Sequence, residues 1–224
     1  MGIYVIFIVI ALVSYLVQSS LKNKFERYSQ MPIAMTRKEV AEKMLHDNGI
    51  YDVRVISTPG MLTDHFNPTD KTVNLSEGVY SSNSVAAAAV AAHECGHAVQ
   101  HATKYGALQL RSSLVPIVSF ASQWISWVLL AGILLIEVMP QIMLAGIILF
   151  AMTTLFSIVT LPVEINASHR ALVWLDRSGI ATGRNNECAK DALKSAAYTY
   201  VVAALGSLAT LMYYVMIFMG RRRD

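Results

Sequence analysis

Four long apolar stretches limit the possible folds of this 224-residue chain more than any other feature. They cover residues 2–17, about 114–139, about 141–161 and about 197–219. All but the first reach the roughly 20 residues that a helix needs to cross about 30 Å of hydrocarbon, because an α-helix rises about 1.5 Å per residue. With 54% hydrophobic residues and a mean hydropathy of +0.46, the chain is predicted to be a mainly α-helical integral membrane protein.

The first apolar stretch is short enough to be a signal peptide. However, no basic residue precedes its apolar run, and residues 19–21 (Ser-Ser-Leu) make a poor cleavage site. We therefore expect this stretch to be retained as a membrane anchor.

Four crossings would leave two polar segments on the same side of the membrane. Only Pro140 separates the second apolar stretch from the third, which predicts a tight helical hairpin. The predicted division of the chain is an N-terminal anchor at 1–20, a first polar segment at 21–112, a transmembrane hairpin at 113–161, a second polar segment at 162–196, a C-terminal transmembrane helix at 197–219 and a basic tail at 220–224.

The basic residues predict which side of the membrane the polar segments occupy. The hairpin tip carries none, whereas the first polar segment has seven near its membrane ends: Lys22, Lys24, Arg27, Arg37, Lys38, Lys104 and Arg111. The positive-inside rule therefore predicts polar segments on the cytoplasmic side of the cell membrane. The C-terminal "RRRD" disagrees, because an even number of crossings places it outside. The net charge of +3 comes from these flanking residues and gives no reason to propose nucleic acid binding.

The first polar segment has the pattern of a small α+β structure. Residues 36–49 predict a helix, in which Thr36 and Glu39 have capping-box spacing. Residues 51–57 and 71–76 are expected to be short strands, separated by a stretch rich in turn residues. A second helix is expected from about Val85, with Asn83 or Ser84 as its N-cap. So small a part is expected to rest on the membrane helices.

The second of these helices contains the sequence H-E-x-x-H, at His93, Glu94 and His97. Positions i and i+4 lie about one turn apart on one helix face, where both imidazoles can bind a single Zn²⁺. Two histidines and a glutamate in an alanine-rich helix would be poor core residues without a partner. We therefore expect one catalytic zinc ion per chain, with Glu94 as the general base that activates the attacking water.

A third ligand is needed from elsewhere. His101 lies eight residues beyond His93, about 12 Å of helix rise, and no glycine breaks the helix between His97 and His101. Glu164 is a better candidate, because Pro162 is expected to start or kink a helix at the end of the third apolar stretch. Glu164 could complete a His-His-Glu zinc site, or it could be an interfacial charge that stabilises a helix N-terminus.

Several stretches together resemble the YugP-like membrane zinc metallopeptidases, or neutral zinc metallopeptidases, over nearly the whole chain. They are "LTDHFNP", "VNLSEGVYSSNSVAAAAVAAHE", "AAHECGHAVQH" and, after the hairpin, "LPVEINASHRAL". More distantly, their order is similar to that of the heat-shock-type and CAAX-type integral membrane metalloproteases. The resemblance implies a small zincin-like, gluzincin-like catalytic part in the cytoplasm, with Glu164 as the third zinc ligand.

The chain departs from the distant relatives at one position. They carry an acid four residues after the ligand glutamate, and this acid orients a zinc histidine. Here that position is Ser168, with Asn166 as another candidate. His169 and Arg170 could donate hydrogen bonds to an oxyanion or face lipid headgroups. The same similarity suggests that the strand "KTVNL" is an edge strand that pairs with an extended substrate.

The sequence therefore predicts an integral membrane zinc metalloendopeptidase that acts on protein or peptide substrates, membrane-associated ones above all, at the cytoplasmic membrane surface. Two alternatives stay open. The first is an intramembrane protease of the class in which N-P-D-G supplies an aspartate ligand, because "NPTD" at 67–70 is similar to that motif. A non-catalytic membrane adaptor would hold a structural metal or none.

Overall fold

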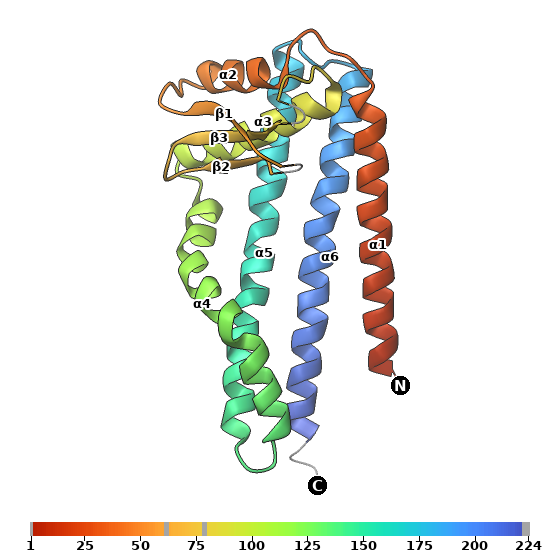
Figure 1. Cartoon of the computed structure of the whole chain (residues 1–224), viewed down its shortest axis with the longest axis vertical. Helices are drawn as coiled ribbons and strands as arrows, with labels where there is room; N and C mark the ends of the chain where they lie inside the picture. The colour runs from red at the N-terminus through yellow and green to blue at the C-terminus, as the bar shows by residue number, and fades with distance from the viewer. Residues whose placement is uncertain (1, 61–62, 78–79, 221–224) are drawn as a thin grey trace. The chain divides into compact units, whose positions relative to one another are not determined.

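The computed structural model describes residues 2–60, 63–77 and 80–220, and it is mainly helical with one small sheet (Figure 1). In chain order the elements are α1 Gly2–Ser29, α2 Arg37–Asp47, β1 Arg54–Thr58, β2 His65–Asn67, β3 Thr72–Ser76, α3 Val85–Ala102, α4 Gly106–Leu134, α5 Pro140–Arg177 and α6 Arg184–Gly220. The basic tail at 221–224, which disagreed with the positive-inside prediction, lies outside the described residues.

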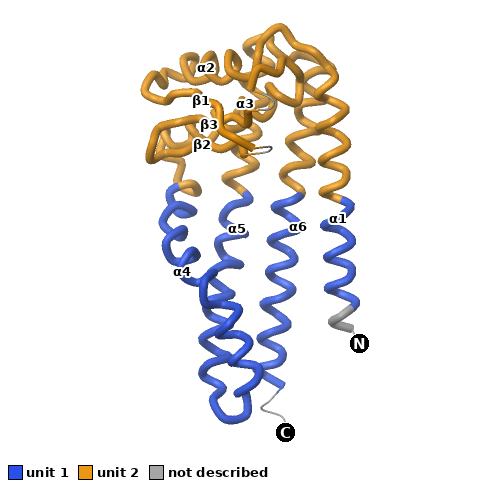
Figure 2. The backbone as a smooth tube through the Cα atoms, in the orientation of Figure 1, with its two compact units in different colours: residues 1–16, 109–161, 199–224 blue, residues 17–108, 162–198 orange. Residues whose placement is uncertain are grey.

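The chain divides into two compact units (Figure 2). The described parts of residues 1–16, 109–161 and 199–224 form the first, which we call the helical unit. Residues 17–108 and 162–198 form the second, the mixed unit, which contains the sheet together with α2 and α3. Helices α1, α4, α5 and α6 each contribute residues to both units.

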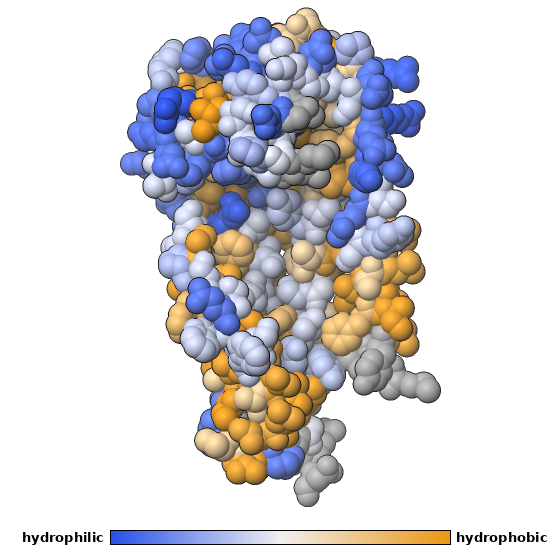
Figure 3. Space-filling view, in the orientation of Figure 1, coloured by the Kyte–Doolittle hydropathy of each residue, from blue (hydrophilic) through white to orange (hydrophobic). Residues whose placement is uncertain are grey.

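Four helices among the described residues are long and apolar enough to cross a membrane, as the sequence predicted. They are Val5–Ser29 of α1 and the whole of α4, α5 and α6. Large apolar side chains on them are exposed, including Trp127 at 69% and Leu134 at 75%. Figure 3 shows apolar side chains gathered on the surface of α1 and on the hairpin end of α4 and α5. Lipid would cover such a surface at no desolvation cost.

The predicted hairpin is present in the helical unit, but its turn lies earlier than expected. Helix α4 ends at Leu134 and α5 begins at Pro140, so the turn occupies 135–139. Pro140 is the first residue of α5, a position whose N–H has no partner within the helix, so proline breaks no helical hydrogen bond there. The two helices approach closely, because a Cβ added to Gly132 would lie 2.6 Å from the Cα of Met143.

The other long helices extend beyond the apolar stretches that predicted them. Helix α1 continues to Ser29, and α6 begins at Arg184 rather than near 197. Helix α5 also runs through Pro162 to Arg177, so no helix starts at Pro162, which was one of the two alternatives predicted there. In each case hydropathy detects only the apolar part of a helix, while the polar turns beyond it carry no such signal.

The mixed unit contains a three-stranded sheet, where the sequence predicted two strands. The strand order is β1-β3-β2, with β1 parallel and β2 antiparallel to β3. The extra strand, β2, has only three residues inside the stretch rich in turn residues, which explains why its pattern was not recognised. Strand β3 is central and fully buried, so the prediction that "KTVNL" is an edge strand is wrong.

Both predicted helices of the first polar segment are present. Helix α2 has the Thr36/Glu39 capping box, and Ser84 is the N-cap of α3, where its side chain accepts a hydrogen bond from the Ala87 N–H. One buried core joins α2, β3 and α3 to α5 and α6, and includes Met44, Leu75, Cys95, Ala171 and Leu193. The small α+β part therefore packs on the polar continuations of the long helices, as its size required.

Candidate metal centre

Helix α3 brings the two histidines of H-E-x-x-H together. His93 and His97 lie one turn apart, with ring centroids 4.8 Å from each other and ring planes at 82°. Glu164, on α5, faces both: its Oε2 lies 3.3 Å from His93 Nε2 and 3.6 Å from His97 Nε2. The three side chains are largely buried, and the Glu164 side chain is only 5% exposed. Glu164 thus faces the histidines and not an aqueous interface.

The spacing of these atoms suits a zinc ion. Two ligand atoms about 2.1 Å from one ion, at the tetrahedral angle of about 109°, lie about 3.4 Å apart. The separations of 3.3 and 3.6 Å bracket that value. Among the described residues, this is the one group of three potential metal ligands that come within 4.8 Å of one another.

The close approach of α3 and α5 at this site depends on Gly96. A Cβ at this position would lie 2.6 Å from the carbonyl oxygen of Ala167 and 3.1 Å from its Cα. Gly96 lies between the two histidines in sequence, and Ala167 lies one turn beyond Glu164. The absent side chain therefore lets the helix of the histidines reach the helix of the glutamate.

Gly96→Ala is expected to lower the free energy of unfolding by about 1–3 kcal/mol, because α5 must move to admit the methyl group. Gly106→Ala is the matched control, since nothing lies within 4 Å of its added Cβ. Urea denaturation of both full-length variants in detergent measures the difference. Equal stability of the two variants would contradict the tight approach.

The other nitrogen of each imidazole also has a partner. Ser168 Oγ lies 3.1 Å from His93 Nδ1, and Gln100 Oε1 lies 3.0 Å from His97 Nδ1. Gln100 Nε2 in turn donates to Asn166 Oδ1 at 3.0 Å, which also accepts from Arg170 Nε at 2.8 Å. Ser168 is thus in contact with a histidine, whereas Asn166 and Arg170 lie one and two hydrogen bonds beyond Gln100.

The remaining sequence candidates lie apart from the cluster. His169 is exposed on α5, and His101 is exposed on α3 with its ring against Phe66, 5.8 Å between centroids. Asp70, of "NPTD", is exposed and accepts a hydrogen bond from Asn67 Nδ2. Asp70 is not part of the group formed by His93, His97 and Glu164. The motif that resembled an intramembrane protease therefore has a local structural role.

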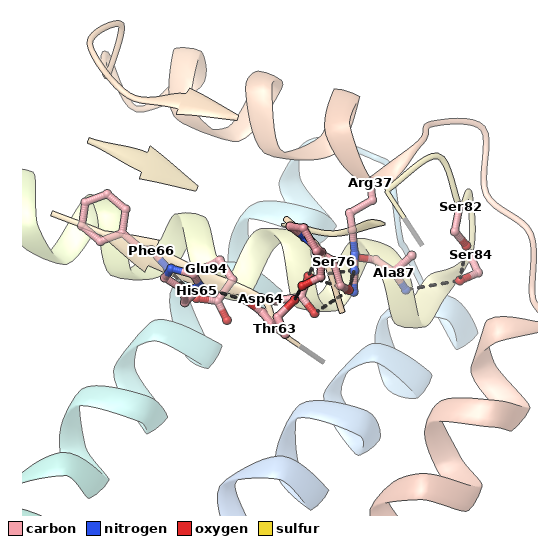
Figure 4. A network of polar contacts seen from close by, with 11 residues as sticks. Arg37, Thr63, Asp64, His65, Phe66, Ser76, Ser82, Ser84, Ala87 and Glu94 are labelled. Atoms are coloured by element: carbon pink, nitrogen blue, oxygen red, sulfur yellow. Dashed lines mark hydrogen bonds and ion pairs between the residues drawn. The ribbon is translucent and has the colours of Figure 1, made fainter. Parts of the chain in front are cut away.

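Glu94 lies beside the cluster and is held by the sheet. Its buried carboxylate accepts a hydrogen bond from the main-chain N–H of Phe66, at 3.1 Å (Figure 4). Phe66 is the middle residue of β2, an edge strand of the sheet. The edge strand that contacts the candidate base is therefore β2.

A buried ion pair anchors the segment that leads into β2. Arg37 Nη1 lies 2.9 Å from Asp64 Oδ1, and the two side chains are 4% and 7% exposed (Figure 4). Asp64 also accepts from the Ser76 N–H on β3, and Arg37 Nε donates to the Ala87 carbonyl on α3. Arg37, expected to be a membrane-flanking charge, instead connects α2, β3 and α3.

The charges around His97 favour its protonation in the absence of metal. Burial lowers the pKa of His97, but the hydrogen bond and the charge of Glu164, with the charge of Glu94, outweigh burial and leave the pKa raised. Binding of a metal ion at His97 would therefore compete with protonation of its imidazole.

Sequence reasoning missed Gln100 and Arg37. Gln100 could have been found, because it lies three residues after His97 on the same face of an apolar helix. Arg37 could not, because its partner Asp64 is 27 residues away in a turn-rich stretch.

Fold and cluster together define a membrane-helix protein with an H-E-x-x-H helix and a His-His-Glu group suited to zinc. The comparisons agree with this class. Residues 3–219 match the family described as "Putative neutral zinc metallopeptidase". The chain is 42% identical, over 213 residues and 94% of each chain, to the "Putative membrane protease YugP" of Bacillus subtilis (strain 168). No solved structure matches. The chain belongs to this neutral zinc metallopeptidase family.

Proposed function

We propose that the protein is an integral membrane zinc metalloendopeptidase that binds one Zn²⁺ through His93, His97 and Glu164. The observation that carries the proposal is the separation of Glu164 Oε2 from the two Nε2 atoms, 3.3 and 3.6 Å, in a largely buried cluster. Membership of a family of neutral zinc metallopeptidases supports peptide-bond hydrolysis as the reaction.

Glu94 is the proposed general base. When bound, zinc polarises the scissile carbonyl and lowers the pKa of a water molecule towards ~7. Glu94 accepts the proton of the attacking water and passes it to the leaving amine. The Phe66 N–H fixes the orientation of the carboxylate, and burial keeps bulk water from competing for that hydrogen bond. Ser168 and Gln100 hold the imidazoles from their Nδ1 sides.

The substrate is proposed to be an extended stretch of protein or peptide that lies along the edge strand β2. An edge strand can take an extended peptide as its next neighbour, and β2 is the edge strand that contacts Glu94, through the Phe66 N–H. The distribution of lysine and arginine supports a cytoplasmic position for both polar segments, and hence for the site. Membrane-associated proteins are therefore the substrates within reach.

Zinc content and chelation test this proposal. Full-length protein purified in detergent is expected to contain about one zinc ion per chain, because the cluster has one set of three ligands. Hydrolysis of fluorescently labelled casein is expected to stop on treatment with 1,10-phenanthroline and to return when zinc is added. A serine-protease inhibitor is the control and should have no effect. Wild-type protein that hydrolyses casein without zinc would contradict the proposal.

A further inference from the structure

Gln100 is a fully buried polar side chain of α3, 0% exposed, that also contacts α5. A buried amide is costly unless its donors and acceptor are all paired. All are paired here: Oε1 with His97, and Nε2 with both the Val163 carbonyl and Asn166. The inference below rests on the proposed function, because it concerns how the metal ligands are held.

The Val163 carbonyl determines which way the Gln100 amide faces. A main-chain carbonyl can only accept a hydrogen bond, so the group 2.8 Å from the Val163 oxygen must be the Gln100 NH₂. The amide oxygen then faces His97 Nδ1 at 3.0 Å and can only accept. His97 Nδ1 therefore carries a hydrogen, which leaves Nε2, the nitrogen that faces Glu164, as the one available to a metal.

The same amide joins the two ligand helices. Val163 directly precedes Glu164 on α5, and Gln100 lies one turn after His97 on α3. The second N–H of Gln100 donates to Asn166 Oδ1, and Arg170 Nε fixes that oxygen from the other side at 2.8 Å. One side chain thus contacts an imidazole ligand and the backbone next to the carboxylate ligand.

We infer that Gln100 is a positioning residue of the metal centre, which fixes the tautomer and ring orientation of His97 relative to Glu164. Gln100 does not touch the reacting atoms. Its effect is on metal affinity, because an imidazole without its outer hydrogen bond loses both its preferred tautomer and its orientation.

Two substitutions of similar size test the inference. Gln100→Met removes both the donor and the acceptor but keeps the unbranched shape. Gln100→Glu keeps an oxygen that accepts the His97 N–H. The expected result is that Gln100→Met weakens zinc binding about 10- to 100-fold, whereas Gln100→Glu binds zinc more tightly than Gln100→Met. Chelator competition on full-length protein in detergent measures the affinity.

His101→Ala is the matched control, since His101 is exposed on α3 next to Gln100, and it should leave zinc affinity unchanged. Thermal unfolding of each variant with excess chelator compares the metal-free folds, and Gln100→Leu provides a second apolar variant if Gln100→Met does not fold. If Gln100 only fills space, the apolar variants should bind zinc as tightly as wild type and more tightly than Gln100→Glu. That order would overturn the inference. A wild-type protein that binds no zinc would overturn the proposed function itself.

Discussion

Glu94→Gln is expected to keep its zinc and to lose hydrolysis of labelled casein by about 10²- to 10⁴-fold, the range that general-base catalysis contributes. The change is nearly isosteric. The new amide oxygen can still accept the Phe66 N–H that now reaches the Glu94 carboxylate, so the contact with β2 survives. What is lost is the ability to take a proton from water, since an amide is not a base at neutral pH.

Zinc content and hydrolysis rate must be measured on the same preparation, because a general base is identified only if hydrolysis is lost while zinc is retained. Glu77→Gln is the matched control: it removes an exposed carboxylate next to β3 and should change neither quantity. If cells that carry Glu94→Gln behaved like cells that carry the wild-type protein, and unlike cells that lack the protein, a non-catalytic adaptor would be the better interpretation. An inactive, zinc-loaded Glu94→Gln protein would also retain uncleaved substrates, which mass spectrometry of the purified complex can identify.

Local patterns were sufficient to predict α2, α3 and the two imidazoles that share a helix face. The i, i+4 spacing of His93 and His97 is a property of a single helix, so no tertiary information was needed. Glu164 was different, because the sequence around it allowed two roles, a zinc ligand or an interfacial charge. The resemblance to a family was needed to favour the ligand role, and the 3.3 Å distance to His93 Nε2 now supports it.

The contacts that hold the site could not be predicted from local patterns. The amide of Gln100 meets Val163 across 63 residues, and the Phe66 N–H meets Glu94 across 28. Both partners come from different elements, and hydropathy or periodicity describes one element at a time. Strand β2 illustrates the limit: it is held by pairing with β3 and by Glu94, and three residues next to Pro68 carry too little strand propensity to be recognised.

Removal of the buried carboxylate that anchors β2 is expected to be the most destabilising change away from the metal cluster. Asp64→Ala leaves the Arg37 guanidinium, 4% exposed, without its ion-pair partner, and leaves the Ser76 N–H without its acceptor. An uncompensated buried charge of this kind costs about 3–5 kcal/mol in the free energy of unfolding. Urea denaturation of full-length protein in detergent measures this cost.

The matched control is Asp52→Ala, which breaks an exposed ion pair. Lys71 Nζ lies 2.6 Å from Asp52 Oδ2, closer than Arg37 Nη1 lies to Asp64, but the two side chains are 55% and 64% exposed. Water screens that pair and solvates Lys71 once Asp52 is gone, so no measurable change in stability is expected. Equal losses in the two variants would mean that burial does not determine the cost. The expected result is a large loss of stability in Asp64→Ala alone. If the fraction that folds also keeps its zinc but hydrolyses more slowly, the ion pair acts on Glu94 through β2.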